Sequence, residues 1–378
     1  MKTVFNINLD FDLSKGSYLY DKNSKSYFLD FFSMFSSLPL GYNHEIFDSL
    51  FYKKINAISS LRMANNLFRT DEMENFIDEF KSIAFHKNLH FCSTGALAFE
   101  SAVKCAYEYY KNPNAIVLGL KNNFHGINSW GFLTDRNLSS VKNRMINFPK
   151  NNWELHDIDN LINIISQDQQ KVACVVIEPI QCTAGDIYID EKKLLTLQKV
   201  CKEKEICFIV DEVQTGFGST GEMWYSKKIG LNPDIIIFGK KSQICGIMVN
   251  DKFSEAIYSD YRKLEVTFDG DLIDAVRSTF IIKAIKSLNL LDKVKANSEL
   301  IRSQLDKYFI NYRSSGHLIA FDFENKMQRD KFCSVAYEEK LLVNPTMDIS
   351  VRLRPNLAIT IREIDDFLSK VHKIVKKI

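Results

Sequence analysis

Residues 234–246 read DIIIFGKKSQICG, and this stretch decides the fold. Three isoleucines and a phenylalanine in succession are typical of a strand that is buried on both faces of a sheet. Gly239 and two lysines, Lys240 and Lys241, follow the strand at once. Because burying an unpaired ammonium group is costly, we expect at least one of these lysines to serve the chemistry of a site.

Similar apolar runs recur from about residue 88 to residue 249, and amphipathic segments separate them. The runs are LHFCS (89–93), AIVLGL (115–120), VACVVIEP (172–179), CFIVDE (207–212) and CGIMV (245–249). This alternation predicts an α/β fold, an open sheet with helices on both faces. We expect a large domain over residues 51–287. A smaller α+β domain would combine residues 1–50 with residues 288–378, where charged helices and short strands replace the alternation.

The composition is that of a soluble intracellular protein. Lys plus Arg number 49 and Asp plus Glu 47, a balance of +2 that argues against binding nucleic acid or an anionic membrane surface. The eight cysteines form no C-x-x-C pair, so we expect reduced thiols and a cytoplasmic location. No stretch approaches the roughly 18 apolar residues of a membrane span.

His86 and His90 lack a third ligand nearby, so we expect surface histidines and no metal.

Polar residues end four of the apolar runs, and in an open sheet the carboxyl ends of the strands form binding sites. These ends are Ser93-Thr94-Gly95, Glu178, Asp211-Glu212 and Lys240-Lys241. The first of them opens a helix whose N–H groups would suit a phosphate. The alternative is an ordinary helix cap by Ser93 or Thr94.

An apolar run that ends in Asp211-Glu212 is also typical of the magnesium-binding strand of nucleotide hydrolases. That interpretation requires G-x-x-x-x-G-K-[ST] elsewhere in the chain. Here Asp234 stands where the first glycine would be and Lys241 where the Ser or Thr would be, so the phosphate loop is missing. A further alternative is that Asp211 only caps a turn.

A buried carboxylate, a buried lysine and a phosphate-binding helix together suit one cofactor, pyridoxal 5′-phosphate. The lysine forms a Schiff base with the cofactor, and the carboxylate holds a proton on the pyridine nitrogen. Burial lowers the pKa of such a lysine, so that its neutral amine can act as nucleophile and then as base.

The sequence resembles the class III aminotransferases of the fold type I pyridoxal-phosphate enzymes, and among them most closely the L-lysine 6-aminotransferases. The stretches that carry the resemblance follow the order of the family and cover most of the chain: residues 27–44, 93–104, 124–126, 177–186, 210–221, 233–246, 267–277 and 351–360. The resemblance implies a mostly parallel sheet in the large domain. It also implies transfer of an amino group from an amino donor to a carbonyl acceptor, in a homodimer whose active sites are shared across the interface.

Roles for individual residues follow from the resemblance. Lys240 would form the Schiff base, because Gly239 precedes it as in the family; Lys241 is the alternative, and we expect it to point away as neighbours on an extended strand do. Asp211 would pair with the pyridinium nitrogen. The other implied cofactor residues are Gly95 and Ala96 at the phosphate, Phe124 on the outer face of the ring, His125, Glu178, Val213 beneath the ring, Gln214 at the phenolic oxygen, and Thr267, which the partner subunit would contribute to the phosphate. Phe124 as plain core packing and Thr267 as a turn residue remain open.

Two departures from the family concern the substrate. Ile127 stands where ω-aminotransferases carry an arginine for a distal carboxylate, and Thr183 stands where they carry a glutamate that neutralises a second arginine. That second arginine is retained as Arg352, with Arg354 as the alternative, and a guanidinium suits a carboxylate. We therefore expect a specificity altered from that of lysine 6-aminotransferase. A racemase or aminomutase of the same fold, or a non-catalytic relative that binds the cofactor, are the alternative functions.

Overall fold

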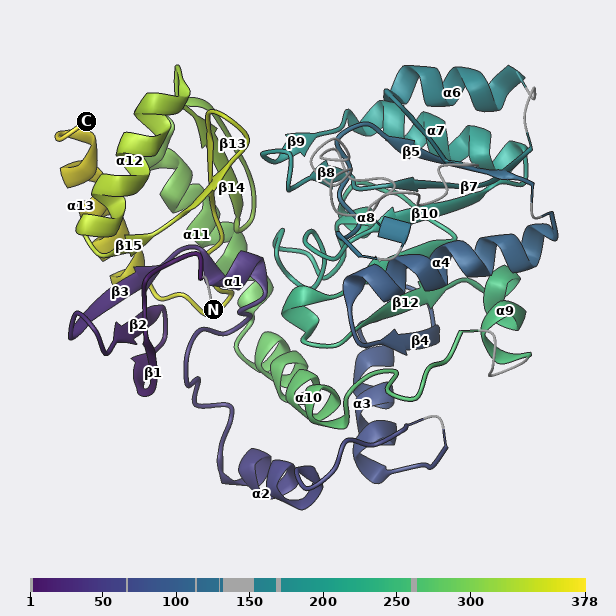
Figure 1. Cartoon of the computed structure of the whole chain (residues 1–378), viewed down its shortest axis with the longest axis horizontal. Coiled ribbons are helices and arrows are strands. Elements are labelled where there is room, and N and C mark those ends of the chain that lie inside the picture. Colours follow the sequence, from purple (N-terminus) through teal and green to yellow (C-terminus); the bar gives the residue numbers. More distant parts are fainter. Residues whose placement is uncertain are drawn as a thin grey trace. The chain divides into compact units, whose positions relative to one another are not determined.

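The computed structural model describes residues 3–65, 67–112, 114–128, 130–131, 153–167, 171–259 and 264–378. Contacts divide the chain into two compact units (Figure 1). The large unit consists of residues 53–217 and 222–282, and the small unit of residues 1–52, 218–221 and 283–378.

A seven-stranded sheet forms the centre of the large unit. Its strands, in spatial order, are β4 (Asn88–Cys92), β12 (Cys245–Val249), β11 (Ile235–Phe238), β10 (Cys207–Asp211), β7 (Val172–Ile177), β5 (Ile116–Leu120) and β6 (Trp153–His156). The pairs from β11 to β6 are all parallel, whereas β12 runs antiparallel to both β11 and β4. The predicted α/β fold with a mostly parallel sheet is confirmed.

Helices cover both faces of this sheet, as its doubly buried strands require. In β11, Ile235 and Ile237 belong to the same apolar cluster as helix α4 (Gly95–Tyr110). The side chain of Phe238 packs instead on Phe80 of helix α3 (Asp71–Lys81), with ring centroids 4.7 Å apart. Helices α6 (Ile158–Gln167) and α7 (Glu191–Glu203) contact each other and cover β5 and β10 on the side away from α4 (Figure 1).

The two lysines that follow β11 lie in a 3-10 turn, Lys240–Ser242, and not on an extended strand. Few residues join β11 to β12, and a connection this short permits only antiparallel pairing. Phe238 accordingly faces Gly246 across the two strands. The reason given above for Lys241 to point away was therefore wrong, because the chain turns at Lys240, whose φ of 54° is left-handed.

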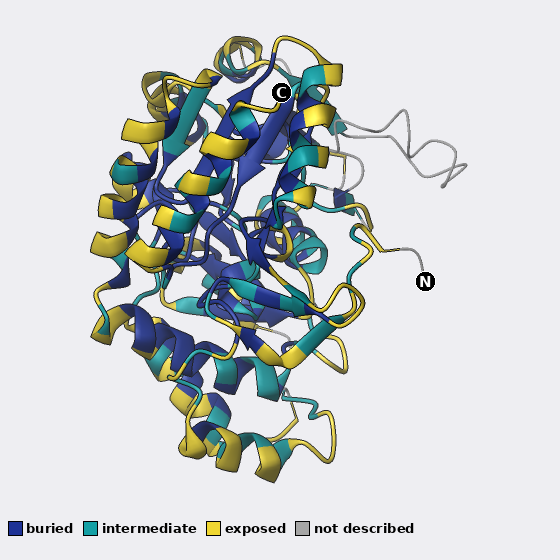
Figure 2. Ribbon diagram, turned by 90° about the vertical axis from the view of Figure 1, so that its left-hand side faces the viewer, coloured by how far each residue is buried: buried dark blue, intermediate teal, exposed yellow. Residues whose placement is uncertain are grey.

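The small unit contains two four-stranded sheets. The first has the order β1 (Leu9–Lys15), β2 (Tyr18–Asp21), β3 (Ser26–Asp30) and β15 (Leu341–Leu342). The second has the order β13 (Ile310–Ser315), β14 (Leu318–Asp322), β17 (Ser350–Leu353) and β16 (Asn344–Thr346). Helices α11 (Leu290–Leu305), α12 (Lys326–Glu338) and α13 (Ile361–Val375) alternate buried and exposed residues, which is the pattern of helices that cover a core on one side (Figure 2).

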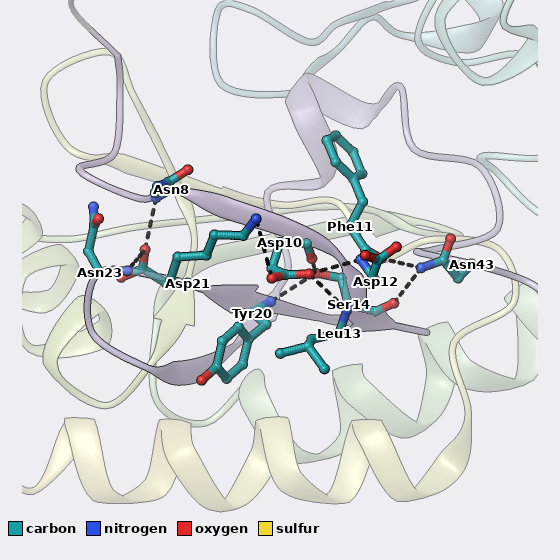
Figure 3. Close-up of polar contacts among 11 residues, drawn as sticks. Asn8, Asp10, Phe11, Asp12, Leu13, Ser14, Tyr20, Asp21, Asn23 and Asn43 are labelled. Atoms are coloured by element: carbon teal, nitrogen blue, oxygen red, sulfur yellow. Dashed lines mark hydrogen bonds and ion pairs between the residues drawn. The ribbon is translucent and has the colours of Figure 1, made fainter.

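Strand β1 is an edge strand, and a bulge interrupts it between Asp10 and Lys15. The Asp10 carboxylate accepts hydrogen bonds from the backbone N–H groups of Asp12 (2.9 Å) and Leu13 (3.1 Å), which holds the bulge in place (Figure 3). Phe11 consequently points outward. Bulges of this kind keep an edge strand from pairing with another chain.

All eight cysteines are free thiols, and six of them are buried. Burial raises the pKa of several of these thiols, as at Cys105, where it reaches about 12. In the part of the chain that the structure describes, no helix has both the length and the apolar character needed to cross a membrane.

Candidate active site

A pocket opens at the carboxyl edge of the large sheet, where the ends of several strands meet. Its lining residues are Gly95, Ala96, Phe124, His125, Gly126, Glu178, Asp211, Val213, Gln214, Lys240 and Cys245. They come from the start of α4 and from the chain segments that follow β5, β7, β10 and β11. Residues that are far apart in sequence, and that were predicted to share a site, are thus brought together within the large unit.

Helix α4 presents its first turn to this pocket. Thr94 is the N-cap and accepts a hydrogen bond from the N–H of Leu97 (3.3 Å). Thr94 can therefore cap the helix while the helix also binds a phosphate. The N–H group that Thr94 caps belongs to Leu97, whereas Gly95 and Ala96, which come before it, line the cavity. N–H groups in the first turn of a helix have no partner within the helix, and they form a ready site for an anion.

Asp211 and His125 form a buried pair at the pocket. The Nδ1 atom of His125 lies 2.7 Å from Oδ2 of Asp211. An ionised carboxylate only accepts hydrogen bonds, so Nδ1 carries the hydrogen. The imidazole ring stacks on Phe99 of α4, with centroids 4.7 Å apart and an interplanar angle of 4°. Asp211 is further held by the N–H of Val213, 3.0 Å from Oδ1.

Glu178 fixes the segment that carries Phe124. Its Oε1 atom accepts a hydrogen bond of 2.6 Å from the backbone N–H of Phe124. Glu178 follows β7, whereas Phe124 follows β5, so the contact ties together two neighbouring strand ends.

Lys240 reaches the pocket from a tightly packed turn. A Cβ atom added at the preceding residue, Gly239, would lie 2.9 Å from the sulfur of Cys245 and 3.5 Å from Val213. A larger residue before Lys240 would require the Cys245 side chain to shift. Left-handed backbone at a residue other than glycine costs about 1 kcal/mol, and such strain is concentrated at functional sites. Lys241 lies beside it with only 2% of its surface exposed.

Glu212, the neighbour of Asp211, stabilises the fold instead of lining the pocket. Its carboxylate accepts hydrogen bonds from the N–H groups of Tyr225 (2.6 Å) and Ser226 (2.8 Å) at the start of helix α8 (Tyr225–Lys228). Burial raises the pKa of this carboxyl group. The two adjacent acids thus have different surroundings.

Four predicted site residues do not line the pocket. Ile127 follows the lining residue Gly126 but is 52% exposed. Thr183 is half-buried in the turn between β8 (Ile180–Gln181) and β9 (Ile187–Tyr188). Thr267 is exposed. Arg352 belongs to the small unit, where it is buried on β17.

Two lining residues, Gly126 and Cys245, were not predicted. Gly126 has a φ of 112°, and a Cβ atom there would lie 2.8 Å from the Cβ of Ala96, so glycine lets this turn approach α4 closely. Cys245 lines the pocket because β12 begins where β11 ends. The short connection between β11 and β12 was a signal from which the antiparallel pairing of the two strands, and so the place of Cys245, could have been predicted.

Among the residues with described positions, no group of three or more His, Cys, Asp or Glu side chains is arranged to hold a metal ion. His86 makes a 2.8 Å contact from Nε2 to the carbonyl oxygen of Pro233. His90 was predicted at the surface, which is wrong: it lies in β4 and is 6% exposed.

Comparison with known proteins gives one consistent family. The family model described as "Aminotransferase class-III" matches residues 2–375. An L-lysine-epsilon aminotransferase of Streptomyces clavuligerus is 27% identical, over 96% of this chain and 89% of that protein. A 4-aminobutyrate aminotransferase of Schizosaccharomyces pombe is 26% identical, over 97% of this chain and 89% of that protein.

Solved structures agree with the sequence comparison. A lysine aminotransferase from M. tuberculosis, solved in the internal aldimine form, superposes with a TM-score of 0.94 at 26% identity, over 100% of this chain and 96% of that one. The family resemblance of the sequence is thereby confirmed. The chain belongs to the class III aminotransferases, enzymes that transfer amino groups with pyridoxal 5′-phosphate as cofactor.

Proposed function

We propose that the pocket of the large unit is the site where this enzyme holds pyridoxal 5′-phosphate and moves an amino group from an amino donor to a carbonyl acceptor. The observation that carries the proposal is the meeting of Lys240, Asp211 and the first turn of α4 in one cavity. These groups offer what the cofactor needs: an amine for its aldehyde, a carboxylate for its ring nitrogen and helix N–H groups for its phosphate.

The pocket residues divide the tasks as follows. Gly95 and Ala96 would hold the phosphate through their N–H groups, while Phe124 and Val213 would enclose the ring and exclude water from it. Gln214 would donate a hydrogen bond to the phenolic oxygen. His125 and Glu178 would keep Asp211 and Phe124 in position; this role is supported by the contacts of 2.7 Å and 2.6 Å that they make.

The chemistry of the transfer requires little more from the chain. When bound, the cofactor draws electrons from the substrate, so that a carbon next to the nitrogen can lose a proton. Asp211 would keep a proton on the ring nitrogen and thereby maintain this electron demand. The amine of Lys240 would hold the cofactor covalently. Once the amine of the substrate has displaced it, Lys240 would accept and return the proton at its Nζ atom. Transfer of the amino group to the carbonyl acceptor would use the same residues in the reverse order.

The experiment that tests this assignment is reduction with borohydride followed by peptide mapping. The purified protein, incubated with cofactor, should carry the reduced label on Lys240, and Lys240→Ala should carry none. The variant Lys241→Ala is the matched control, because it removes the neighbouring amine, and it should still be labelled at Lys240. Label on Lys241, or a protein that takes up no cofactor, would overturn the assignment.

A homodimer with shared sites forms part of the proposal. Thr267 lies exposed on a loop beside two exposed apolar residues, Val266 and Phe268. The loop is fastened to the segment before α3: the Arg62 guanidinium lies 4.7 Å from the centre of the Phe268 ring, and Asn65 donates a hydrogen bond of 2.8 Å to the carbonyl oxygen of Gly270. An ordered, exposed apolar loop supports contact with a second copy of the chain, in whose phosphate site Thr267 would act.

The specificity we propose is altered from that of the lysine-epsilon aminotransferases. Ile127 and Thr183 offer no charge to the distal end of a substrate. Arg352 is our candidate for the substrate carboxylate, because it stands where the family carries its second arginine. The alternative, Arg354, donates from Nη1 to the carbonyl oxygens of Ile319 (3.2 Å) and Leu353 (3.0 Å). Uncharged distal groups are therefore expected to be preferred in the substrate.

We also place the enzyme in the cytoplasm. The support for this location is the set of eight free cysteines, since reducing compartments keep thiols in that state.

A further inference from the structure

Three chain segments meet behind the pocket, and the side chain of Asn123 lies at their junction. The first is the turn after β5, which carries Phe124 and His125 into the pocket. The second is the end of β7 with Glu178. The third is the hairpin of β8 and β9, whose turn carries Thr183. Asn123 is fully buried among them.

Asn123 belongs to the first segment, and its side-chain amide forms hydrogen bonds to the other two. Its Nδ2 atom donates to the carbonyl oxygen of Val176 in β7 (3.2 Å). Its Oδ1 atom accepts from Nε2 of Gln181 in β8 (2.9 Å) and from the backbone N–H of Glu178 (3.4 Å). A buried amide with both ends engaged fixes its neighbours, because breaking any of these bonds leaves a polar group unsatisfied.

The contact between the first two segments is reciprocal. Asn123 accepts a hydrogen bond from the backbone of Glu178, and Glu178 accepts one from the backbone of Phe124, the residue next to Asn123. Each segment thus supplies a side-chain oxygen to the main chain of the other. The orientation of the peptide before Phe124, and with it the direction in which Phe124 enters the pocket, is set by this pair of bonds.

The contact with the third segment reaches toward the substrate side. Gln181 bonds both to Asn123 and, from the same Nε2 atom, to the carbonyl oxygen of Lys121 (2.6 Å). The turn that follows Gln181 contains Thr183, which we have proposed as part of the substrate wall. One buried amide therefore supports both the cofactor side and the substrate side.

We infer that Asn123 is a positioning residue of this enzyme, which fixes Phe124 against the cofactor and the Thr183 turn against the substrate. The inference rests on the proposed cofactor site and deepens it. Asn123 is not among the residues that line the pocket, so its effect would pass through Glu178 and Gln181. Its loss should weaken cofactor binding and raise the KM for the amino donor, beyond any loss of stability.

The test compares Asn123→Ala with Asn297→Ala in the full-length protein. Asn297 is the matched control: it is also buried, and its Nδ2 atom also donates to a main-chain carbonyl, that of Ile359 (3.3 Å), in the small unit. Both variants should lower the Tm of the cofactor-free protein. Only Asn123→Ala should raise the Kd for pyridoxal 5′-phosphate, by about tenfold or more, as expected when buried hydrogen bonds are lost.

Two further variants keep the test decisive if Asn123→Ala does not fold. Asn123→Asp retains the accepting oxygen and should restore part of the cofactor affinity. Gln181→Leu cuts only the link to the Thr183 turn, so it should raise the KM for the donor while the Kd for the cofactor stays within about twofold of wild type. Equal cofactor affinity in the Asn123 and Asn297 variants, or an unchanged donor KM in Gln181→Leu, would overturn the inference. Failure of the wild-type protein to bind the cofactor would instead overturn the proposed function.

Discussion

His125 and Asp211 meet 2.7 Å apart at the pocket, although 86 positions separate them in the sequence. The ring of Phe99 covers one face of the imidazole, so the pair is shielded from water. This arrangement holds the carboxylate of Asp211 in one place at the pocket, where we propose that it pairs with the ring nitrogen of the cofactor.

Replacing Asp211 by Asn tests the need for that charge. The amide oxygen can still accept the hydrogen bond from His125, so the fold is expected to persist. Loss of the charge should lower kcat/KM by roughly a hundredfold or more, as for other preorganised electrostatic groups. Steady-state kinetics at saturating cofactor measure the effect. The control is Asp234→Asn, at a carboxylate that bonds to the N–H of Phe208 at the other end of β10; its kcat/KM should stay near that of wild type.

Mixed dimers test whether Thr267 acts in the site of the partner. Lys240→Ala and Thr267→Ala should each be defective alone at limiting cofactor. If the sites are shared, a mixed dimer contains one site with both native residues, and random mixing should restore about a quarter of the wild-type sites. The measurement is activity against mixing ratio. No recovery in mixtures that size-exclusion chromatography shows to be hybrid would contradict a shared site.

Substitution of Thr183 by Glu, together with Ile127→Arg, tests the proposed specificity. The two charges should improve kcat/KM for lysine or 4-aminobutyrate. The new arginine would offer a partner for a substrate carboxylate, and the new glutamate would neutralise Arg352 when the distal amine occupies the site. A donor screen with 2-oxoglutarate as acceptor measures the change. Wild-type rates with lysine as high as those of the double variant would refute an altered specificity, and turnover without any acceptor would favour a racemase or aminomutase.

Comparison of alanine variants at Gly126 and Gly230 tests whether the turn that contains Gly126 must lie close to the start of α4. Both have positive φ, 112° and 75°, so alanine strains the backbone at either position. At Gly126 the new Cβ would also meet Ala96 at 2.8 Å, whereas at Gly230 nothing lies within 4 Å. The backbone strain should cost each variant about 1 kcal/mol of stability, and the contact with Ala96 should add to the loss in Gly126→Ala. Only Gly126→Ala should weaken cofactor binding, measured by titration of the cofactor-free protein. Equal affinities would show that the turn can move at no cost.

Asp269 gives the chain a pH-dependent stability that can be removed. Burial raises the pKa of its carboxyl group from 3.8 to about 6, although the N–H of Val266 donates to it at 2.7 Å. The Asp269 carboxyl group therefore binds a proton more tightly in the folded chain than in the unfolded chain. The stability that this protonated carboxyl group contributes is lost as pH rises from about 4 to about 6. His90, 4.0 Å away, does not compensate, because burial lowers its pKa to about 4.

Asp269→Asn should consequently raise the Tm above pH 6 by a few degrees and leave it unchanged below pH 4. Asn retains an oxygen for the N–H of Val266. Thermal unfolding of variant and wild type at the two pH values measures the difference. Asp348→Asn, at an exposed acid, should show no such dependence. A Tm gain for Asp269→Asn that is equal at both pH values would exclude titration of this group as the cause.

The sequence was sufficient to predict those parts of the site that depend on the order of the strands. Gly95, Glu178, Asp211 and Lys240 each end an apolar run, and parallel strands bring such ends to one edge. Turn geometry was not predictable in the same way. Lys240 was treated as part of an extended strand, whereas the reversal into β12 places it in a 3-10 turn.

Tertiary packing explains the remaining differences. The spacing of His86 and His90 permitted a helix, but pairing of β4 with β12 buries His90 opposite Ile247. Asn123 gave no signal as a functional residue, because its importance depends on Gln181 and Glu178, more than fifty residues away. Contacts of this length are set by the assembled sheet and not by any local pattern.

The burial of the cysteine thiols has a practical consequence. Six of the eight thiols are enclosed in the folded protein, and the other two are only partly accessible. A thiol-reactive fluorogenic dye should react slowly with the folded protein, at Cys245 and Cys333, because burial raises the pKa of both thiols, and its fluorescence should rise sharply when unfolding exposes the other six. The enzyme thus carries its own reporter for thermal-shift screening of amino donors, without any introduced label.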